Sequence, residues 1–370
     1  MPTIRDVAQL AGVSITTVSH VVNSTRPVSA DRMARVQQAI AGLGYQPNAV
    51  ARSLRISETR MFGMIVPDNS NPYFAEVARS IEDASFELGY SVILCNSDED
   101  AIKEQAYLDL LVEKRVDGIA FVATGRRADC LDSKRLRGLP VVVVDREVDA
   151  GAWASVLVHN SRGGREAVAH LVKLGHRRIG CISGPRGLGP SSERVRGYRA
   201  ALRKAGMAPD PRWIVEGDFH AEGGYRAMCE LLEPDAALTA VFACNDMMAV
   251  GALRAIHEHG RRVPEDIALV GFDDIALASY TQPALTTIAQ PYRELGRRVA
   301  QLLAKGASGE GAAPERIRLE PELVVRASCG ASNAPPNGPP EPLMLARPPS
   351  RQRLGKERRI PRRSANKETT

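Results

Sequence analysis

Residues 3–23 read TIRDVAQLAGVSITTVSHVVN, and this stretch decides how the N-terminal part of the chain folds. Thr3 followed by Asp6 predicts a capping box that opens a helix. Gly12 permits the sharp turn that follows, and Ser14 is placed to cap a second helix. Two short helices at this spacing predict a helix–turn–helix, whose second helix fits the major groove of DNA.

A third helix is expected after Ser29, because Val36, Ile40 and Leu43 recur at helical spacing before Gly44. The three helices offer few apolar side chains, so the core that they share must be very small. The sequence therefore predicts a small all-α head at the N-terminus.

The outer face of the second predicted helix carries polar side chains suited to DNA. Side chains near its start or on one face are expected to reach base edges, namely Ile15, Thr16, Thr17 and His20. Others are better placed for phosphates, which position a protein without carrying sequence information: Ser14, Ser19, Asn23 and Arg26. An ordinary helical hairpin is the alternative, and the spacing of the motif argues against it.

Residues 48–55, NAVARSLR, predict a short helix that Asn48 caps. A helix of this length is unstable alone in water, so it would form when docked against DNA and a second copy of itself. Arg52 and Arg55 are then expected to meet phosphates, and Leu54 to wedge between base steps in the minor groove. A plain linker is the alternative interpretation.

From residue 62 onward the pattern changes to strands alternating with helices. Apolar runs typical of strands buried on both faces are FGMIVP, SVILCN, VDGIAFVA and LPVVVVD, and after residue 175 RRIGCISG, ALTAVFAC and EDIALVGFDD. Such alternation predicts parallel sheets with helices on both sides, and two series of runs predict two similar doubly wound lobes. LTTIA (285–289) and a helix from about Pro291 to Lys305 are expected to cross back between the lobes.

The composition is that of a soluble globular protein with more than one domain: 370 residues, 44% hydrophobic and 25% charged. No run approaches 18 uninterrupted apolar residues, and the N-terminus lacks a secretory signal pattern. The six cysteines are scattered without a CxxC pair, which favours reduced thiols over disulfides or a zinc site. We therefore expect a cytoplasmic protein that does not enter a membrane.

Charge is divided unevenly along the chain. Residues 1–60 carry a net charge of +4, residues 61–330 carry −4 and residues 331–370 carry +6. A basic head on an acidic body is typical of a polyanion-binding module joined to another domain. The last forty residues hold eight prolines and no heptad pattern, which predicts a disordered basic tail.

The chain resembles the lactose-repressor (LacI) family of regulators from residue 3 to about residue 330. The head motifs TIRDVAQLAGVSITTVSHVVN and GYQPNAVARSL carry this resemblance, together with NPYFAEVARSIEDA, GHRRIGCISGP, CNDMMAVGAL, VPEDIALVGFDD and LTTIAQP. It implies a homodimer that reads a near-palindromic operator, with Leu54 as the lever of a hinge helix, and a sensor folded like a periplasmic sugar-binding protein. We expect a helix–turn–helix domain (1–46), a hinge and linker (47–60), a two-lobed sensing and dimerisation domain (61–330) and the tail (331–370).

A sugar pocket needs aromatic faces for the C–H faces of the ring and planar polar groups for its hydroxyls. In open α/β sheets such residues lie in loops beyond the carboxyl ends of the strands. The candidates in those loops are Asn71, Tyr73, Phe74, Asp145, Arg146, Arg194, Phe219, Asn245, Asp273 and Gln290. Each has a structural alternative: Tyr73 or Phe74 as core, Asp145 and Arg146 as a surface pair, Asp273 as a loop cap.

The ten candidates resemble the ligand set of periplasmic ribose-binding proteins, and GDFHAEGGYRAM resembles ribose operon repressors. Purine-sensing relatives use an Arg and a Thr in the loop that here reads Gly187-Leu188-Gly189-Pro190, and neither Leu188 nor Pro190 bonds a purine edge by its side chain. We therefore rank ribose first as the effector, another sugar second and a purine third. Inducer and corepressor roles both stay open, as does control by a phosphocarrier protein corepressor instead of a small molecule.

Signatures of catalysis and of metal or cofactor binding fail on inspection. Asp273 and Asp274 are neighbours in sequence and point apart, whereas a glycosidase needs two carboxyls that face one bond. His257 and His259 point to different sides of a helix, so they predict no metal site. We expect a DNA-binding transcriptional regulator that binds no cofactor and is not an enzyme.

Overall fold

The computed structural model describes residues 2–23, 26–45, 58–125, 130–131, 136, 138–148, 153–233, 237–310 and 314–331. Arg52, Leu54 and Arg55 of the expected hinge lie outside the described residues, as does the tail from residue 332. The expectations for these segments stay predictions. No helix in the described ranges is both long enough and apolar enough to cross a bilayer.

The head consists of three helices, α1 (Ile4–Ala11), α2 (Ile15–Asn23) and α3 (Ala30–Leu43). The Thr3 hydroxyl accepts from the amide of Asp6 while the Asp6 carboxylate accepts from the amide of Thr3, so the capping box is confirmed. Gly12 ends α1 in the left-handed conformation (φ 60°), and the Ser14 hydroxyl accepts from the amide of Thr17 to cap α2. The small core between the helices holds Val7, Ala8, Ala11, Val18, Val36 and Ala39.

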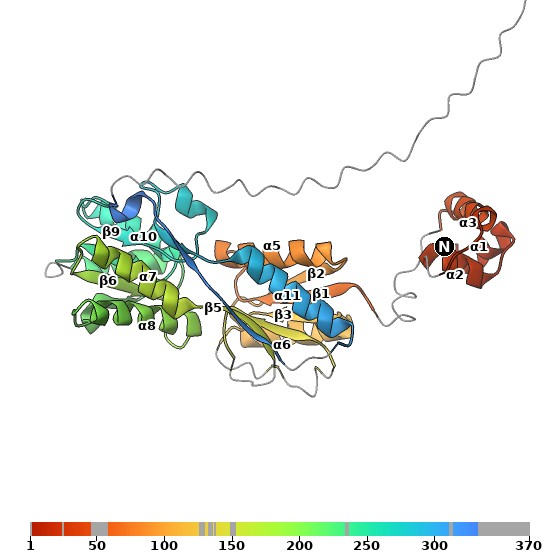
Figure 1. Cartoon of the computed structure of the whole chain (residues 1–370), viewed down its shortest axis with the longest axis horizontal. Coiled ribbons are helices and arrows are strands. Elements are labelled where there is room, and N and C mark those ends of the chain that lie inside the picture. Colours follow the sequence, from red (N-terminus) through yellow and green to blue (C-terminus); the bar gives the residue numbers. More distant parts are fainter. Residues whose placement is uncertain are drawn as a thin grey trace, which may run out of the picture. The chain divides into compact units, whose positions relative to one another are not determined.

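Lobe 1 (residues 58–158 and 291–320) contains a six-stranded parallel sheet in the order β11-β5-β4-β3-β1-β2. The strands are β1 (Met61–Val66), β2 (Ser91–Asn96), β3 (Gly118–Phe121), β4 (Val141–Val144), β5 (Ala154–Val158) and β11 (Arg316–Leu319). Helices α5 (Pro72–Glu87) and α11 (Tyr292–Ala307) cover one face of the sheet, and α6 (Ala101–Glu113) covers the other (Figure 1).

Lobe 2 (residues 159–289 and 322–331) contains a four-stranded parallel sheet in the order β7-β6-β8-β9. Its strands are β6 (Ile179–Ser183), β7 (Ile214–Glu216), β8 (Ala240–Ala243) and β9 (Ala268–Val270). Helices α7 (Asn160–Lys173) and α8 (Gly189–Lys204) pack together on one face, and α9 (Ala221–Leu231) packs with α10 (Asp246–Glu258) on the other. Short 3-10 helices are η1 (Pro211–Trp213), η2 (Ala276–Ser279) and η3 (Ala327–Cys329).

The chain passes between the lobes three times. The crossings follow β5, β10 (Thr287–Ala289) and β11, and β10 pairs antiparallel with β12 (Glu322–Val324) beside the last crossing. The predicted fold class is confirmed: an all-α head and an α/β sensor with two parallel sheets. One expectation was wrong, because α11 packs along α5 within lobe 1 instead of crossing between the lobes.

Four strands were not predicted, namely β5, β7, β11 and β12. β7 and β12 have three residues each, too few to show a periodicity. β11 lies at the edge of its sheet, so its Arg-Ile-Arg-Leu sequence keeps exposed charges between its apolar residues. β5, with sequence ASVLV, resembles the predicted strands and carries a buried Ser155 within the run.

Glycines let paired helices of lobe 2 approach each other closely. A Cβ atom added to Gly251 of α10 would lie 1.8 Å from the carbonyl oxygen of Ala221 in α9. A Cβ added to Gly197 of α8 would lie 2.3 Å from the carbonyl oxygen of Ser161 in α7. Backbone atoms cannot yield as a flexible side chain does, so any larger residue would push these helices apart.

We expect Gly251→Ala to lower the free energy of unfolding of the sensor by about 1–3 kcal/mol, because the added methyl group overpacks the α9–α10 contact. Gly189→Ala is the matched control, since no atom lies within 4 Å of a Cβ added there. Urea unfolding of both variants measures the difference. Equal stability of the two variants would contradict the packing argument.

Candidate functional site

The head presents the start and one side of α2 to solvent. Ser14, Ile15, Thr16 and Arg26 are exposed, and Thr17, His20 and Asn23 are partly exposed. Val18 is fully buried in the core of the head, so it fixes which side of α2 faces outward. Ile15 is notable as a large apolar side chain that is 45% exposed at a position expected to read bases.

Ser19 is placed differently from the expectation that it is available to a phosphate. It is only 6% exposed, and the side-chain amide of Asn23 donates to both its carbonyl oxygen (2.8 Å) and its hydroxyl (3.3 Å). Ser19 and Val18 are the two buried residues of α2. Its position suits orienting Asn23 better than direct contact with DNA.

The ten predicted effector residues come together where the carboxyl ends of the strands of both lobes meet. Asp145 and Arg146 directly follow β4, Asn245 follows β8, and Gln290 follows β10. Nine of the ten line a single cleft with Pro190: Asn71, Tyr73, Phe74, Asp145, Arg146, Arg194, Phe219, Asn245 and Asp273. Gln290 joins the same cluster by hydrogen bonds to Asp273 and Tyr73. All except Phe219, which is partly exposed, are buried.

On the lobe 1 side, the Tyr73 hydroxyl donates to the Asp145 carboxylate at 2.5 Å. Arg146 donates to the carbonyl oxygens of Ala123 and Thr124, and its guanidinium lies 5.5 Å from the centre of the Phe74 ring. The alternative in which Asp145 and Arg146 form a surface pair is wrong, because both side chains are 5% exposed.

On the lobe 2 side, Arg194 is the best-connected side chain of the cleft. Its Nε donates to Asn160 Oδ1 at 2.8 Å, and its Nη1 donates to the carbonyl oxygen of Cys244 and lies 3.3 Å from Asp273 Oδ1. The guanidinium also lies 3.7 Å from the centre of the Phe272 ring. A buried guanidinium held on several sides is fixed in orientation, which suits recognition of ring oxygen or hydroxyl atoms.

Gln290 and Tyr292 join the two halves of the cleft. Gln290 Nε2 donates to Asp273 Oδ1 at 2.7 Å, and the Tyr292 hydroxyl donates to the carbonyl oxygen of Asp273 at 2.9 Å. Both residues follow β10, where the chain passes from lobe 2 to lobe 1. A change at Asp273 therefore reaches the second crossing directly.

Burial controls the electrostatics of the cleft. It raises the pKa of the Asp273 carboxyl to about 7, although Arg194 and the hydrogen bond from Gln290 act to lower it. Burial, followed by the charge of Asp145, holds the pKa of Tyr73 well above its usual value. Tyr73 is therefore a neutral donor at physiological pH, whereas Asp273 is poised between acceptor and donor.

Three of the cleft residues have backbones in the left-handed region, which L-residues rarely adopt: Asp145 (φ 63°), Phe219 (φ 67°) and Asp273 (φ 118°). Such conformations cost on the order of 1–3 kcal/mol each and persist where the surrounding structure imposes them. Their grouping around one cleft indicates a binding site. Asp274 carries its carboxylate away, 2.7 Å from Arg326, so Asp273 and Asp274 do point apart as predicted.

Among the supporting residues that sequence reasoning missed, Asn160 and Asp246 connect the cleft to other elements. Asn160, the first residue of α7, accepts from Arg194 and donates to the carbonyl oxygen of Val158 (3.3 Å) at the end of β5. Asp246 is fully buried and accepts from the Thr287 hydroxyl and the amide of Ile275, which ties α10 to β10. Recognising β5 as a strand would have placed Asn160 beyond its carboxyl end, among the other candidates.

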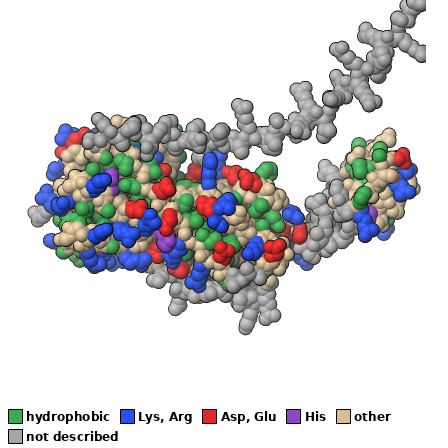
Figure 2. Space-filling model, in the orientation of Figure 1, with side chains coloured by type: hydrophobic (Ala, Val, Ile, Leu, Met, Phe, Trp, Pro, Cys, Tyr) green, Lys and Arg blue, Asp and Glu red, His purple; other side chains and the backbone are tan. Residues whose placement is uncertain are grey.

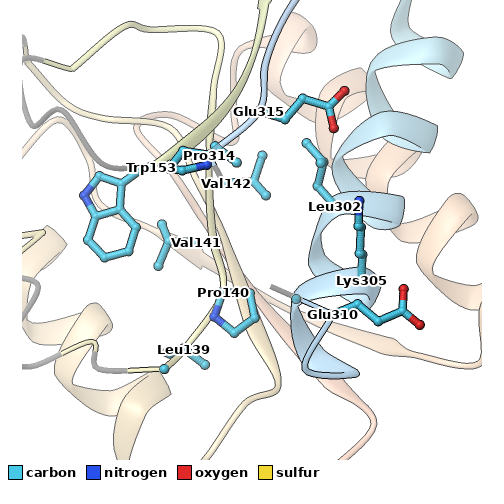
Figure 3. A pocket seen from close by; sticks show the side chains of 13 residues that line it. Leu139, Pro140, Val141, Val142, Trp153, Leu302, Lys305, Glu310, Pro314 and Glu315 are labelled. Atoms are coloured by element: carbon cyan, nitrogen blue, oxygen red, sulfur yellow. The ribbon is translucent and has the colours of Figure 1, made fainter. Parts of the chain in front are cut away.

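A second, larger hollow of about 260 Å³ lies at the opposite edge of the lobe 1 sheet, where β4 and β5 begin. Figure 3 shows Val141 and Trp153 on one side of it, and Leu302 and Lys305 of α11 on the other. Most of its lining side chains are apolar, so it lacks the set of polar groups that a hydroxylated ligand needs. Within the described ranges no group of three or more His, Cys, Asp or Glu side chains is placed to hold a metal ion.

A helix–turn–helix head joined to a two-lobed sensor with a polar cleft defines a ligand-responsive DNA-binding regulator. The family model for bacterial regulatory proteins of the lacI family matches residues 3–48, and the model for the periplasmic binding protein-like domain matches residues 168–329. The HTH-type transcriptional repressor PurR of Pasteurella multocida is 42% identical over 329 residues, 89% of this chain and 98% of its own length. The chain belongs to the lacI family of DNA-binding transcriptional repressors and is not an enzyme.

Solved structures of the family share the fold. One is the structure of the lac repressor dimer bound to operator and the anti-inducer ONPF, which is 30% identical in sequence. The match covers 89% of this chain and 99% of the lac repressor chain, with a TM-score of 0.81. A LacI family regulator from Enterococcus faecium with bound ribose is 34% identical, covers 72% of this chain and 98% of its own, and has a TM-score of 0.66.

We expect effector binding to weaken as the pH falls through 7. A ligand hydroxyl that donates to ionised Asp273 lowers its pKa in the complex, so binding releases a proton near neutral pH. The dissociation constant should rise about tenfold from pH 8 to pH 6. Calorimetry in buffers of different ionisation enthalpy measures the released proton.

Asp273→Asn should abolish this pH dependence of the dissociation constant, because the carboxyl whose pKa is about 7 is then absent. Asp145→Asn is the control. The dissociation constant of this variant should still depend on pH, but the transition should move to lower pH, since the charge of Asp145 raises the pKa of Asp273. A dissociation constant that is constant from pH 6 to pH 8 in the wild-type protein would refute the role of Asp273.

Asn160→Ala should weaken effector binding by about 10–100-fold, because a buried charged donor loses its acceptor. Asn160→Asp should restore most of the affinity, since a carboxylate oxygen accepts from Arg194 in the same place. Titration calorimetry on both variants tests the positioning role. Wild-type affinity in Asn160→Ala would show that Arg194 needs no support from α7.

Proposed function

We propose that this repressor changes its affinity for a near-palindromic operator when a small neutral polar ring binds the cleft between its lobes. The observation that carries the proposal is the buried Arg194–Asp273 pair, with Nη1 and Oδ1 3.3 Å apart and Gln290 donating to the same carboxylate. Buried charged groups are costly unless they are partnered, so a cleft that gathers them serves a ligand that bonds to them.

The lining favours a sugar, with ribose first. Carboxylate, guanidinium and amide groups surround the cleft from both lobes, as hydroxyls that donate and accept in many directions require. Tyr73, Phe74 and Phe219 supply aromatic surface for the C–H faces of a ring. The relative from Enterococcus faecium carries ribose in its structure.

A purine base is the second candidate, and the curated relatives favour it over ribose. The repressor at 42% identity is named PurR, as are the further relatives at 38–42% identity. Against this, Leu188 and Pro190 carry no side-chain donor or acceptor for a purine edge, and Pro190 lines the cleft. Arg186 in the same loop is 87% exposed and pairs with Glu216. The two candidates also differ in their expected effect on operator affinity. We expect a sugar to lower the affinity of the repressor for its operator and a purine to raise it.

The cleft of this structure encloses only about 20 Å³, room for about one water molecule. A ring of either kind therefore requires the lobes to separate before it enters. Because Asn160 and Gln290 stand at crossings between the lobes, a ligand held by Arg194 and Asp273 biases the angle between the lobes. The shift in operator affinity is limited to the difference in ligand affinity between the two arrangements.

The second copy of the homodimer is expected to cover apolar side chains that the single chain leaves exposed. Leu277 of η2 is 41% exposed, and Tyr280 beside it is 83% exposed. The lac repressor structure is a dimer bound to operator. Large apolar groups side by side on a surface are typical of an interface.

We expect D-ribose to bind the purified protein with a micromolar dissociation constant in titration calorimetry. Arg194→Ala should abolish binding, and Arg196→Ala is the matched control, because Arg196 is exposed and pairs with Glu193 on the same helix. Other pentoses, hexoses, hypoxanthine and guanine complete the panel. If a purine binds and ribose does not, the cleft remains the effector site and the proposed effector is wrong. If no compound of the panel gives a binding heat, control by a protein corepressor is favoured.

A further inference from the structure

Residues 165–204 contain ten lysine and arginine residues and two glutamates, a net charge of +8. The whole segment 61–330 has a net charge of −4, so this part of lobe 2 departs strongly from its surroundings. The segment covers most of α7 and all of α8. Figure 2 shows Lys and Arg side chains gathered over this region, in the lower left of the view.

Five of these cations define what we call the α7–α8 face: Arg165 and Lys173 on α7, and Arg199, Arg203 and Lys204 on α8. All five are exposed, and none has a carboxylate within 4.0 Å among the residues that the structure describes. Other surface arginines of the same helices are paired, Arg162 with Glu166 and Arg196 with Glu193. The face is therefore basic without internal neutralisation.

Both rows of cations point away from the same sheet. Arg165 and Lys173 are eight residues apart, about 12 Å along the axis, on the exposed side of α7. Arg199 and Arg203 are four residues apart and share the exposed side of α8. The helices touch where Gly197 of α8 meets Ser161 of α7, so the two rows lie side by side.

Stabilisation of helix ends explains only part of this arrangement. Lys173, Arg203 and Lys204 lie in last turns, where cations interact favourably with the helix dipole. Arg165 and Arg199 lie in the middle of their helices, where no such benefit exists. Arg199 and Arg203 repel each other at i,i+4 spacing, a small cost that an external anion would remove.

We propose that the α7–α8 face binds the phosphate backbone of double-stranded DNA, as a second DNA contact besides the helix–turn–helix head. Guanidinium groups bond phosphate oxygens in pairs, and rows of cations on convex helices contact a backbone without entering a groove. The chain belongs to a family of DNA-binding repressors, so double-stranded DNA is a polyanion that it meets in its working environment. An acidic protein surface is the competing partner, and the experiment below separates the two.

The test measures binding of the full-length protein to a 30-base-pair duplex of random sequence by fluorescence anisotropy across a NaCl series. The variant R165E/R199E/R203E reverses three charges of the face. The control variant K114E/R115E/R261E reverses three exposed cations elsewhere in the sensor that also have no carboxylate within 4.0 Å among the described residues. The head and the tail are identical in all three proteins.

We expect the face variant to lose at least tenfold in affinity at 50 mM NaCl and to show a shallower salt dependence, because fewer counterions are released. The control variant should stay within about threefold of wild type. The neutral variant R165Q/R199Q/R203Q, whose helices keep good helix formers, should lose at least threefold.

Equal losses in the face and control variants would overturn the proposal, since net charge alone would then explain them. Unchanged binding in the face variants would overturn it as well. Binding to a polyglutamate peptide is measured in parallel. If the face variant loses peptide binding but binds the duplex as the wild type does, the proposal is overturned, because the partner of the face is then an acidic protein.

Discussion

The cleft depends on how the Arg194 guanidinium is satisfied inside the protein. A buried guanidinium is costly, and here Asn160, the carbonyl oxygen of Cys244 and Asp273 share its donors while Phe272 lies against its face. These partners come from α7, the end of β8 and the loop after β9. Satisfying one side chain therefore brings together elements that are distant in sequence.

The same bonds connect the cleft to the crossings between the lobes. Asn160 stands at the first crossing and Gln290 at the second, while Glu320 at the third lies 3.6 Å from His159 and 2.9 Å from Arg162 at the first. Packed lobes do not deform continuously, so a ligand that changes the angle between them acts on all three crossings together. The architecture thus links recognition to a movement that the DNA-binding part can use.

The two effector candidates rest on different kinds of evidence. Overall sequence similarity favours a purine, and the chemistry of the cleft favours a sugar. Identity over the whole chain favours the PurR relatives, and it is summed over core, head and surface alike. Ten side chains line the cleft, and their donors and acceptors decide what binds. Sequence identity and ligand can therefore diverge within a family that shares one fold.

Much of the fold followed from local rules. Residues that are neighbours in sequence determine the cap at Thr3, the turn at Gly12 and the buried strands. Capping and hydrophobic periodicity act over only a few positions. Strands β7 and β12 were not predicted, because three residues are too few to show a hydrophobic periodicity. Strand β11 was not predicted, because an edge strand keeps exposed charged residues between its apolar ones.

The sequence by itself determined the class of protein, its two lobes and the ten candidate residues of the cleft. Only the tertiary structure decided that Ser19 is buried, that Asn160 and Asp246 support the cleft, and that two helices carrying exposed cations, α7 and α8, pack together. The reason is physical: burial and hydrogen-bond partners depend on which distant segments pack together, and no local pattern records that packing.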